Sequence, residues 1–174
     1  MNSSANHATR LTPSSSALAI VDALTPTEVG VARELFVEYA QSLNFSLCFQ
    51  GFDQELATLP GSYVRPAGRL LLGLQNGQAV GCVALRPLEA NGCEMKRLYV
   101  RPVARGTGLG ASLAQRIVTE ARAEGYTVMR LDTLPTMAKA IALYRRMGFV
   151  SIANYNANPL PDALFLELDL RQRR

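Results

Sequence analysis

The segment from Glu94 to Ala111 constrains the fold more than any other part of the chain, because it predicts a strand, a glycine-rich loop and a helix in direct succession. Residues 94–100 are rich in large, β-branched and aromatic side chains and stop before Pro102, as a strand would. Apolar residues then recur along one helical face, at Leu109, Leu113, Ala114, Ile117, Val118 and Ala121. This order predicts a strand that leads through a loop into an amphipathic helix.

The loop between this strand and helix has the composition of an anion-binding site. It reads Arg105, Gly106, Thr107, Gly108, Leu109, Gly110 and Ala111. Glycines at alternate positions remove Cβ atoms, so backbone N–H groups can converge on an anion where the helix begins. Arg105 adds a cation beside them. The pattern predicts a phosphate-binding loop, although a glycine-rich turn with an incidental arginine is the alternative for such a loop taken alone.

A dinucleotide-binding site is a second alternative for the same glycines. Gly106, Gly108 and Ala111 fit the pattern GxGxxG/A, and Asp132 follows at a strand end about twenty residues later. Two features argue against it. Residues 101–105 separate the strand from the glycines, and the strand carries three charged residues where a strand buried on both faces would be apolar.

A second motif lies further along the chain, at residues 140–149, with the pattern A-x-x-L-Y-x-x-x-G-F. Together with Arg-Gly-x-Gly-x-Gly after a strand that ends in Leu-x-Val, it resembles the two motifs of the GNAT superfamily of acyl-CoA-dependent N-acyltransferases. The resemblance covers residues 18–170 and is sharp over 94–149. It implies an α/β (α+β mixed sheet) fold, in which a central mixed sheet has two splayed strands and helices on both faces.

The remaining patterns fit this order of elements. Strands are predicted at 18–23, 69–75, 78–86, 94–100, 127–133, 149–153 and 163–170. Helices are predicted after a capping box at Thr25–Glu28 and at 53–59, 109–124 and 136–147. Asn76-Gly77 predicts a tight hairpin. With 174 residues, 48% of them hydrophobic, the chain suits one domain at 17–174 after a polar tail at 1–16.

Composition argues against several classes of function. The one histidine, His7, lies in the tail, so no metal site is expected. Three cysteines without CxxC spacing, a net charge of +4 and no apolar run of membrane-spanning length predict a cytoplasmic protein with free thiols. The positive charges are spread through the chain, so neither a nucleic acid nor a membrane is an expected partner.

The resemblance assigns the cosubstrate, acetyl-CoA, and the residues that hold it. The backbone amides of Gly106, Thr107, Gly108, Leu109, Gly110 and Ala111, with Arg105 beside them, would bind the pyrophosphate. The backbone of Leu98 and Val100 would pair with the pantetheine arm as an added strand does. Both roles belong to the backbone, so the side chains of Leu98 and Val100 can serve the core.

Glu94 is the candidate base that removes a proton from the acceptor amine. It precedes Leu98 by four residues, so strand alternation places both on one face unless a bulge intervenes. Some GNAT members have a catalytic glutamate at that offset. A salt bridge to Lys96, Arg97 or another cation is the structural alternative, and many relatives remove the proton through water instead.

Tyr144 is the candidate acid that protonates the departing thiolate. The resemblance aims its hydroxyl at the CoA sulfur, whereas its helical spacing alone would suit a core tyrosine with a satisfied hydroxyl. The sequence departs from the family pattern at one nearby position. Relatives often have asparagine where this chain has Met137, so a polar contact to the cosubstrate is lost or supplied by Thr133 or Thr136.

The expected acceptor is a small-molecule amine that reacts directly with acetyl-CoA in a ternary complex. Its predicted walls are Phe45, Phe49, Phe52, Asn154, Tyr155 and Asn156. Two rival functions remain, a non-catalytic acyl-CoA sensor and an acetyltransferase for proteins or peptides. The oligomeric state, monomer or homodimer, stays open at this level.

Overall fold

The computed structural model describes residues 17–43, 47, 51–156, 158 and 160–172. The predicted tail at 1–16 lies outside these ranges, as do Phe45, Cys48 and Phe49. Within them, no helix is both long enough and apolar enough to cross a membrane. Cys82 and Cys93 are buried free thiols on neighbouring strands, as their packing role requires.

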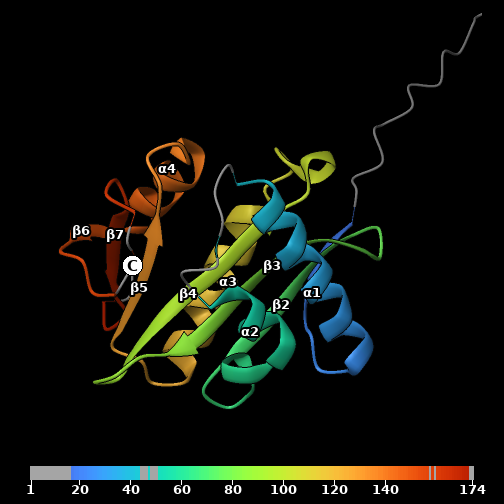
Figure 1. The fold of residues 1–174 in the computed structure, drawn as a ribbon, viewed down its shortest axis with the longest axis horizontal. Helices are drawn as coiled ribbons and strands as arrows, with labels where there is room; N and C mark the ends of the chain where they lie inside the picture. Colours follow the sequence, from blue (N-terminus) through green and yellow to red (C-terminus); the bar gives the residue numbers. More distant parts are fainter. Residues whose placement is uncertain (1–16, 44–46, 48–50, 157, 159, 173–174) are drawn as a thin grey trace, which may run out of the picture.

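A mixed seven-stranded sheet forms the centre of the described chain (Figure 1). Its strands are β1 (Leu18–Asp22), β2 (Arg69–Gln75), β3 (Gln78–Pro87), β4 (Gly92–Val100), β5 (Val128–Thr133), β6 (Val150–Ile152) and β7 (Leu164–Asp169). They lie in the order β1-β2-β3-β4-β5-β7-β6, and only the β4–β5 pair is parallel. The predicted fold class and order of elements are confirmed.

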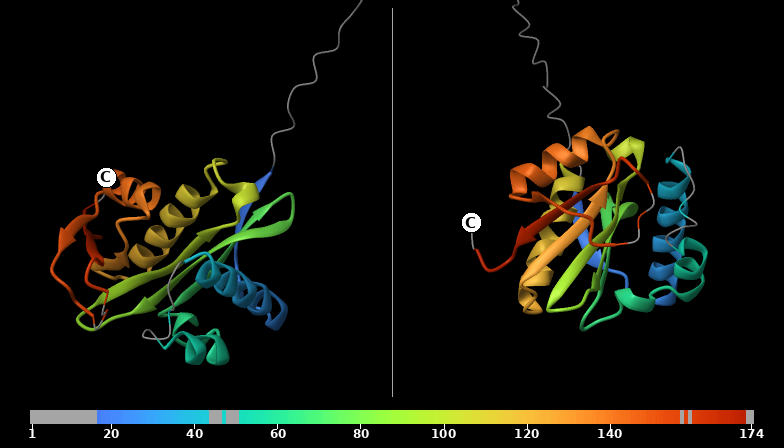
Figure 2. Two further views of the ribbon diagram at one scale, coloured as in Figure 1. Left: turned by 45° about the horizontal axis from the view of Figure 1, so that its top comes forward. Right: turned by 60° about the vertical axis from the view of Figure 1, so that its left-hand side comes forward.

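Helices cover both faces of this sheet, as Figure 2 shows. They are α1 (Pro26–Gln41), α2 (Phe52–Thr58), α3 (Leu109–Ala123) and α4 (Ala138–Met147), with short 3₁₀ turns at Gly61–Tyr63 and Pro102–Ala104. The core on the α1/α2 face contains Leu35, Phe36 and Tyr63. The core on the other face contains Leu113 and Ile117 from α3 together with Tyr144 from α4.

Local sequence signals account for where these elements begin and end. The Thr25 hydroxyl accepts from the Glu28 N–H at 3.3 Å, and the Glu28 carboxylate accepts from the Thr25 N–H at 2.8 Å, which completes the predicted capping box of α1. Asn76 and Gly77 both have positive φ, at 52° and 80°, and so turn the chain from β2 into β3. Gly148, at φ 96°, ends α4 in the left-handed conformation.

The strands β4 and β5 separate soon after they meet. They pair only at Gly92–Val128, Cys93–Met129 and Glu94–Arg130, although each strand continues well beyond this ladder. Both strands run in the same direction, so their carboxyl-terminal halves diverge. We call the gap between these halves the fork. The predicted splayed pair of strands is therefore present at the centre of the sheet.

A β-bulge in β4 corrects one expectation about the faces of this strand. The pairing with β3 shifts between Cys82 and Ala84, and Arg97 has a φ of 58°, in the left-handed region. The extra residue reverses the alternation, so Leu98 packs into the α3/α4 core with Met95. Glu94 lies opposite Arg86 and pairs with it instead. Glu94 and Leu98 therefore lie on opposite faces of the sheet, which is the exception expected if a bulge intervenes.

Candidate active site

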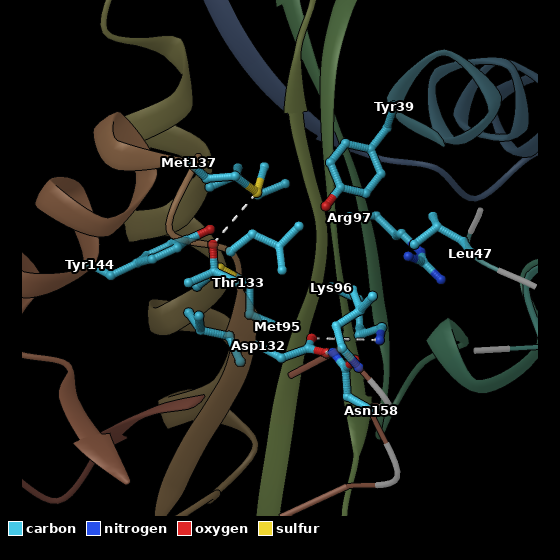
Figure 3. A pocket seen from close by; sticks show the side chains of 14 residues that line it. Tyr39, Leu47, Met95, Lys96, Arg97, Asp132, Thr133, Met137, Tyr144 and Asn158 are labelled. Atoms are coloured by element: carbon cyan, nitrogen blue, oxygen red, sulfur yellow. Dashed lines mark hydrogen bonds and ion pairs between the residues drawn. The ribbon is translucent and has the colours of Figure 1, made fainter. Parts of the chain in front are cut away.

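A cavity passes through the sheet at the fork between β4 and β5 (Figure 3). It is partly open to solvent. It is lined by Tyr39, Leu47, Met95, Lys96, Arg97, Leu98, Leu131, Asp132, Thr133, Leu134, Met137, Tyr144, Asn158 and Leu160. Side chains from both faces of the sheet meet here, because the separated strands leave a passage between them.

Tyr144 borders the cavity from the α4 side of the sheet. Its side chain is 7% exposed and its ring lies 5.6 Å from that of Phe149. Burial raises the pKa of the phenol above its ordinary value of 10.0, so it stays protonated at neutral pH. No described residue is a hydrogen-bond partner of its hydroxyl, unlike the satisfied hydroxyl of a core tyrosine. The group is a proton donor directed at the cavity.

Met137 and Thr133 lie beside this tyrosine in Figure 3. The Thr133 hydroxyl donates to the Met137 sulfur at 3.6 Å, and both residues line the cavity. Met137 is also the N-cap of α4, without a side-chain capping bond. Of the two threonines considered as substitutes for the missing asparagine, Thr133 is at the cavity, whereas Thr136 is exposed and does not line it.

The glycine-rich loop has the backbone geometry that an anion site needs. Gly106 and Gly108 have φ values of 83° and 90°, and Gly108 is the N-cap of α3. A Cβ atom at either position would meet no other atom within 4 Å, so the space in front of the loop is open. The first N–H groups of α3, including those of Gly110 and Ala111, have no acceptor within the helix and face this side.

The neighbouring residues of the loop hold it to the core and to β4. The Thr107 hydroxyl donates to the Ala104 carbonyl at 2.8 Å, and the Leu109 N–H donates to that hydroxyl at 3.4 Å. The Leu109 side chain is buried in the α3 core. Arg105 donates from Nε to the Val100 carbonyl at 3.0 Å, so its guanidinium lies at the end of β4 and close to the loop.

The backbone of Leu98 and Val100 is directed toward the fork. The Arg101 N–H donates to the Val80 carbonyl on β3, and backbone groups alternate in direction along a strand. The backbone N–H and C=O groups of Leu98 and Val100 therefore point away from β3, toward the gap where β5 no longer pairs with β4. This orientation, with the open space before Gly106 and Gly108, fits a cosubstrate that has a diphosphate and an amide-containing arm.

On the α1/α2 side the cavity has a charged wall. The Lys96 ammonium lies 4.0 Å from Asp132 and 4.0 Å from Glu94, and Asn158 donates to Asp132 at 2.8 Å. Burial lowers the pKa of Lys96, although both carboxylates oppose this shift. The next residue, Arg97, binds both oxygens of Glu55, at 3.0 and 2.5 Å. Burial acts against its charge, but the bonds to Glu55 outweigh this and raise its pKa.

Glu94 is close to this wall but is not part of the cavity lining. Its side chain is completely buried, its Oε2 lies 2.5 Å from Arg86 Nε, and its Oε1 accepts from the Tyr155 hydroxyl at 2.8 Å. The structural alternative, an ion pair, is therefore present, with Arg86 as the main partner. Lys96 stands between Glu94 and the cavity.

The acceptor walls differ in part from those expected. Phe52 is buried under the Arg97 guanidinium, 5.0 Å from its ring centre, and does not line the cavity. Tyr155 donates to Glu94 instead of forming a wall, whereas Asn158, three residues later, lines the cavity. Phe45 and Phe49 lie outside the described residues.

Several polar lining residues were not assigned to the site from the sequence, among them Tyr39, Lys96, Asp132 and Asn158. For Lys96 a signal was available. It follows Glu94 by two residues, before the bulge, and therefore shares its face. Asp132 lies near the end of the strand that forks from β4, which also marks it. The positions of Tyr39 and Asn158 depend on how α1 and the loop after β6 pack, and no local pattern shows this.

The match to a family model and the similarity to known proteins agree with this geometry. Residues 32–149 match the model of the acetyltransferase (GNAT) family. An uncharacterised N-acetyltransferase of Schizosaccharomyces pombe is 40% identical over 147 residues, which cover 83% of this chain and 90% of that protein. An IAA acetyltransferase of Azospirillum brasilense is 39% identical over 108 residues, 61% of this chain and 71% of that protein.

A solved structure extends the likeness to the fold. An acetyltransferase of Salmonella typhimurium, solved with its cofactor acetyl-CoA, superimposes with a TM-score of 0.69 at 21% identity, over 88% of this chain and 94% of that one. The family match spans the forked strands, the glycine loop and Tyr144 together. The chain belongs to the GNAT family of acetyltransferases, which are acetyl-CoA-dependent enzymes.

Proposed function

We propose that this enzyme transfers an acetyl group from acetyl-CoA to the amine of a small molecule, by direct attack within a ternary complex. The observation that carries the proposal is the cavity at the fork, which passes from Tyr144 on one face to Lys96 and Asp132 on the other. Two substrates entering from opposite faces would meet between the strands. No covalent enzyme intermediate is then required, because the two reacting groups share one space.

The residues that hold acetyl-CoA are proposed to act mainly through their backbone. The amides from Gly106 to Ala111 bind the diphosphate, with Arg105 as the nearby cation, and Leu98 and Val100 pair with the pantetheine arm. The thioester supplies the acetyl group, and it would lie between Leu98 and Tyr144.

Three side chains are proposed to move protons. Glu94 is the proposed base, and Lys96 relays the proton because Glu94 does not line the cavity. In this relay the Lys96 ammonium gives a proton to Glu94 and takes up the proton that the amine loses. Tyr144 donates a proton to the sulfur as the carbon–sulfur bond breaks and the carbon–nitrogen bond forms. Its raised pKa keeps that proton available at neutral pH.

A thiol-release assay with acetyl-CoA tests the proposal across simple amines, amino acids and peptides. We expect release with small amines or amino acids and acetylated products of matching mass. CoA binding without release from any acceptor would instead identify an acyl-CoA sensor. Release with peptides alone would identify a protein or peptide acetyltransferase.

The name of the A. brasilense relative, IAA acetyltransferase, favours the first outcome. The matched negative control is the Tyr144→Phe variant, which should bind CoA and release thiol slowly with every acceptor.

A further inference from the structure

The β-bulge in β4 requires a backbone conformation that its residue type disfavours. Arg97 and Leu98 together lie opposite one residue of β3, Val83. The first residue of a bulge with left-handed backbone is usually glycine, because a Cβ atom disfavours positive φ. Arg97 has a φ of 58° and is not glycine. Contacts of its side chain are therefore needed to stabilise this conformation.

The helix α2 supplies such contacts. The Arg97 guanidinium donates to both carboxylate oxygens of Glu55, at 3.0 and 2.5 Å, and lies 5.0 Å from the ring centre of Phe52. The Tyr63 hydroxyl donates to Glu55 at 2.7 Å and so fixes the carboxylate in turn. The side chains of Arg97 and Glu55 are 3% and 15% exposed, so solvent screens this ion pair only weakly.

The conformation of Arg97 determines where the next backbone N–H points. The Cys82 thiol, in the core on the α1/α2 face, donates to the Arg97 carbonyl at 3.3 Å. The peptide between Arg97 and Leu98 is trans, so its C=O and N–H point in opposite directions. The Leu98 N–H therefore points away from the α1/α2 core, toward the face of the sheet that carries Tyr144.

We propose that Glu55 is a positioning residue for acetyl transfer, because through Arg97 it holds the bulge and keeps the Leu98 N–H directed at the arm of acetyl-CoA. The inference rests on the proposed function, in which the backbone of Leu98 pairs with the pantetheine arm. It gives a role to α2, none of whose residues lines the cavity. A helix on one face of the sheet thereby sets the backbone geometry that the cosubstrate meets on the other.

Glycine separates the backbone conformation from the ion pair. It adopts positive φ readily, whereas alanine does not. Three variants are compared with the wild type: Glu55→Gln, Glu55→Gln/Arg97→Gly and Glu55→Gln/Arg97→Ala. Glutamine retains an oxygen that can accept from the Tyr63 hydroxyl, and the double variants remove both charges of the pair together. Arg97 also lines the cavity, but the two double variants lack its side chain equally.

The first measurement is the affinity for acetyl-CoA, by calorimetric titration. Glu55→Gln should weaken binding about threefold to tenfold, the usual worth of one hydrogen bond. Glu55→Gln/Arg97→Ala should bind as weakly. Glu55→Gln/Arg97→Gly should return to within about twofold of the wild type, although it has lost a further side chain, because glycine holds the bulge without support.

Glu38→Gln is the matched control for the loss of an ion pair between a helix and β4. The Arg101 guanidinium, directly after β4, donates to both oxygens of Glu38 on α1. This pair supports no residue with positive φ, since Arg101 is outside the left-handed region. The control should bind acetyl-CoA as the wild type does.

The second measurement is amide hydrogen exchange at Leu98, followed by NMR with and without acetyl-CoA. Acetyl-CoA should slow this exchange in the wild type and in the glycine double variant, and much less in the alanine double variant. Because these two variants differ by one methyl group, a general loss of stability through the missing ion pair would affect both. Their comparison is informative even where Glu55→Gln alone does not fold.

Equal affinity and equal protection of Leu98 in the two double variants overturn the inference, as does tighter binding by the alanine variant. A Glu55→Gln protein that matches the wild type in both measurements also overturns it. If acetyl-CoA leaves Leu98 unprotected in the wild type, the proposed placement of the cosubstrate fails and the inference fails with it. If the variants follow the expected order but no amine is acetylated, the proposed transfer to a small molecule fails alone.

Discussion

The substitution Tyr144→Phe separates a catalytic hydroxyl from a structural one. The ring packs in the core against Phe149, and phenylalanine retains this contact. No described residue is a hydrogen-bond partner of the hydroxyl, so its removal leaves no donor or acceptor of those residues unsatisfied. We therefore expect a change in the free energy of unfolding below about 1 kcal/mol, and a melting temperature within about 3 °C of wild type for a chain of this length.

The rate should respond much more strongly. The thiolate needs a proton as the carbon–sulfur bond breaks, and Tyr144 is a proton donor that borders the α4 side of the cavity. Loss of one proton donor lowers a rate by about tenfold to a thousandfold, which is about 1.4 to 4 kcal/mol in the barrier. The affinity for acetyl-CoA should stay near wild type, because the backbone contacts of the loop are unchanged.

Tyr126→Phe is the matched control. The Tyr126 hydroxyl donates to the Ala67 carbonyl at 2.8 Å, at a distance from the cavity. Its loss should cost about 1 kcal/mol of stability and leave turnover unchanged. Single-turnover rate and melting temperature are measured on the same preparation of each variant. A Tyr144→Phe protein that melts lower but reacts at the wild-type rate would refute the assignment of this tyrosine as the acid.

The other predictions concern the loop, the base and pH. Gly108→Val should weaken CoA binding at least about tenfold, or about 1.4 kcal/mol, while Gly77→Val, which imposes a similar positive-φ strain in the β2–β3 turn, should leave CoA affinity unchanged by calorimetry. Glu94→Gln should lower kcat by about a hundredfold with little change in CoA affinity; a wild-type rate would assign the base to water or another residue. Because burial raises the pKa of Tyr144, its acid form persists as pH rises, so the single-turnover rate should not fall between about pH 8 and about pH 10. An alkaline loss of rate in that range that disappears in Tyr144→Phe would contradict the raised pKa.

Local sequence patterns were sufficient to predict the elements and their order. The capping box at Thr25, the Asn76-Gly77 turn and the periodicity after Leu109 each depend on neighbouring residues only. The fork itself was an implication of the family resemblance, and the short β4–β5 ladder confirms it. A strand pattern does not reveal how far two strands remain paired, because that depends on contacts between distant segments.

The bulge in β4 explains why Glu94 and Leu98 lie on opposite faces of the sheet. Arg97 adopts a positive φ although it is neither glycine nor asparagine, so its residue type does not predict this backbone conformation. The conformation is held by tertiary contacts, namely the bonds to Glu55 and the stacking over Phe52. These contacts join α2 to β4, and a count of alternating residues cannot include them. The same packing buries Phe52, which is why it does not form the expected wall.

The short β4–β5 ladder also has a consequence for how amide hydrogens exchange with solvent. Backbone N–H groups within the ladder, such as that of Cys93, are expected to exchange slowly, whereas those of Leu98 and Val100 open to the fork and should exchange fast in the protein alone. Bound acetyl-CoA would accept hydrogen bonds there and slow exchange at these two residues selectively. A ligand at a hundredfold excess over its Kd would also stabilise the whole fold by about 2.7 kcal/mol. The cosubstrate would thus complete the hydrogen bonding of the sheet, and protein kept without it should be the form most readily opened along β5.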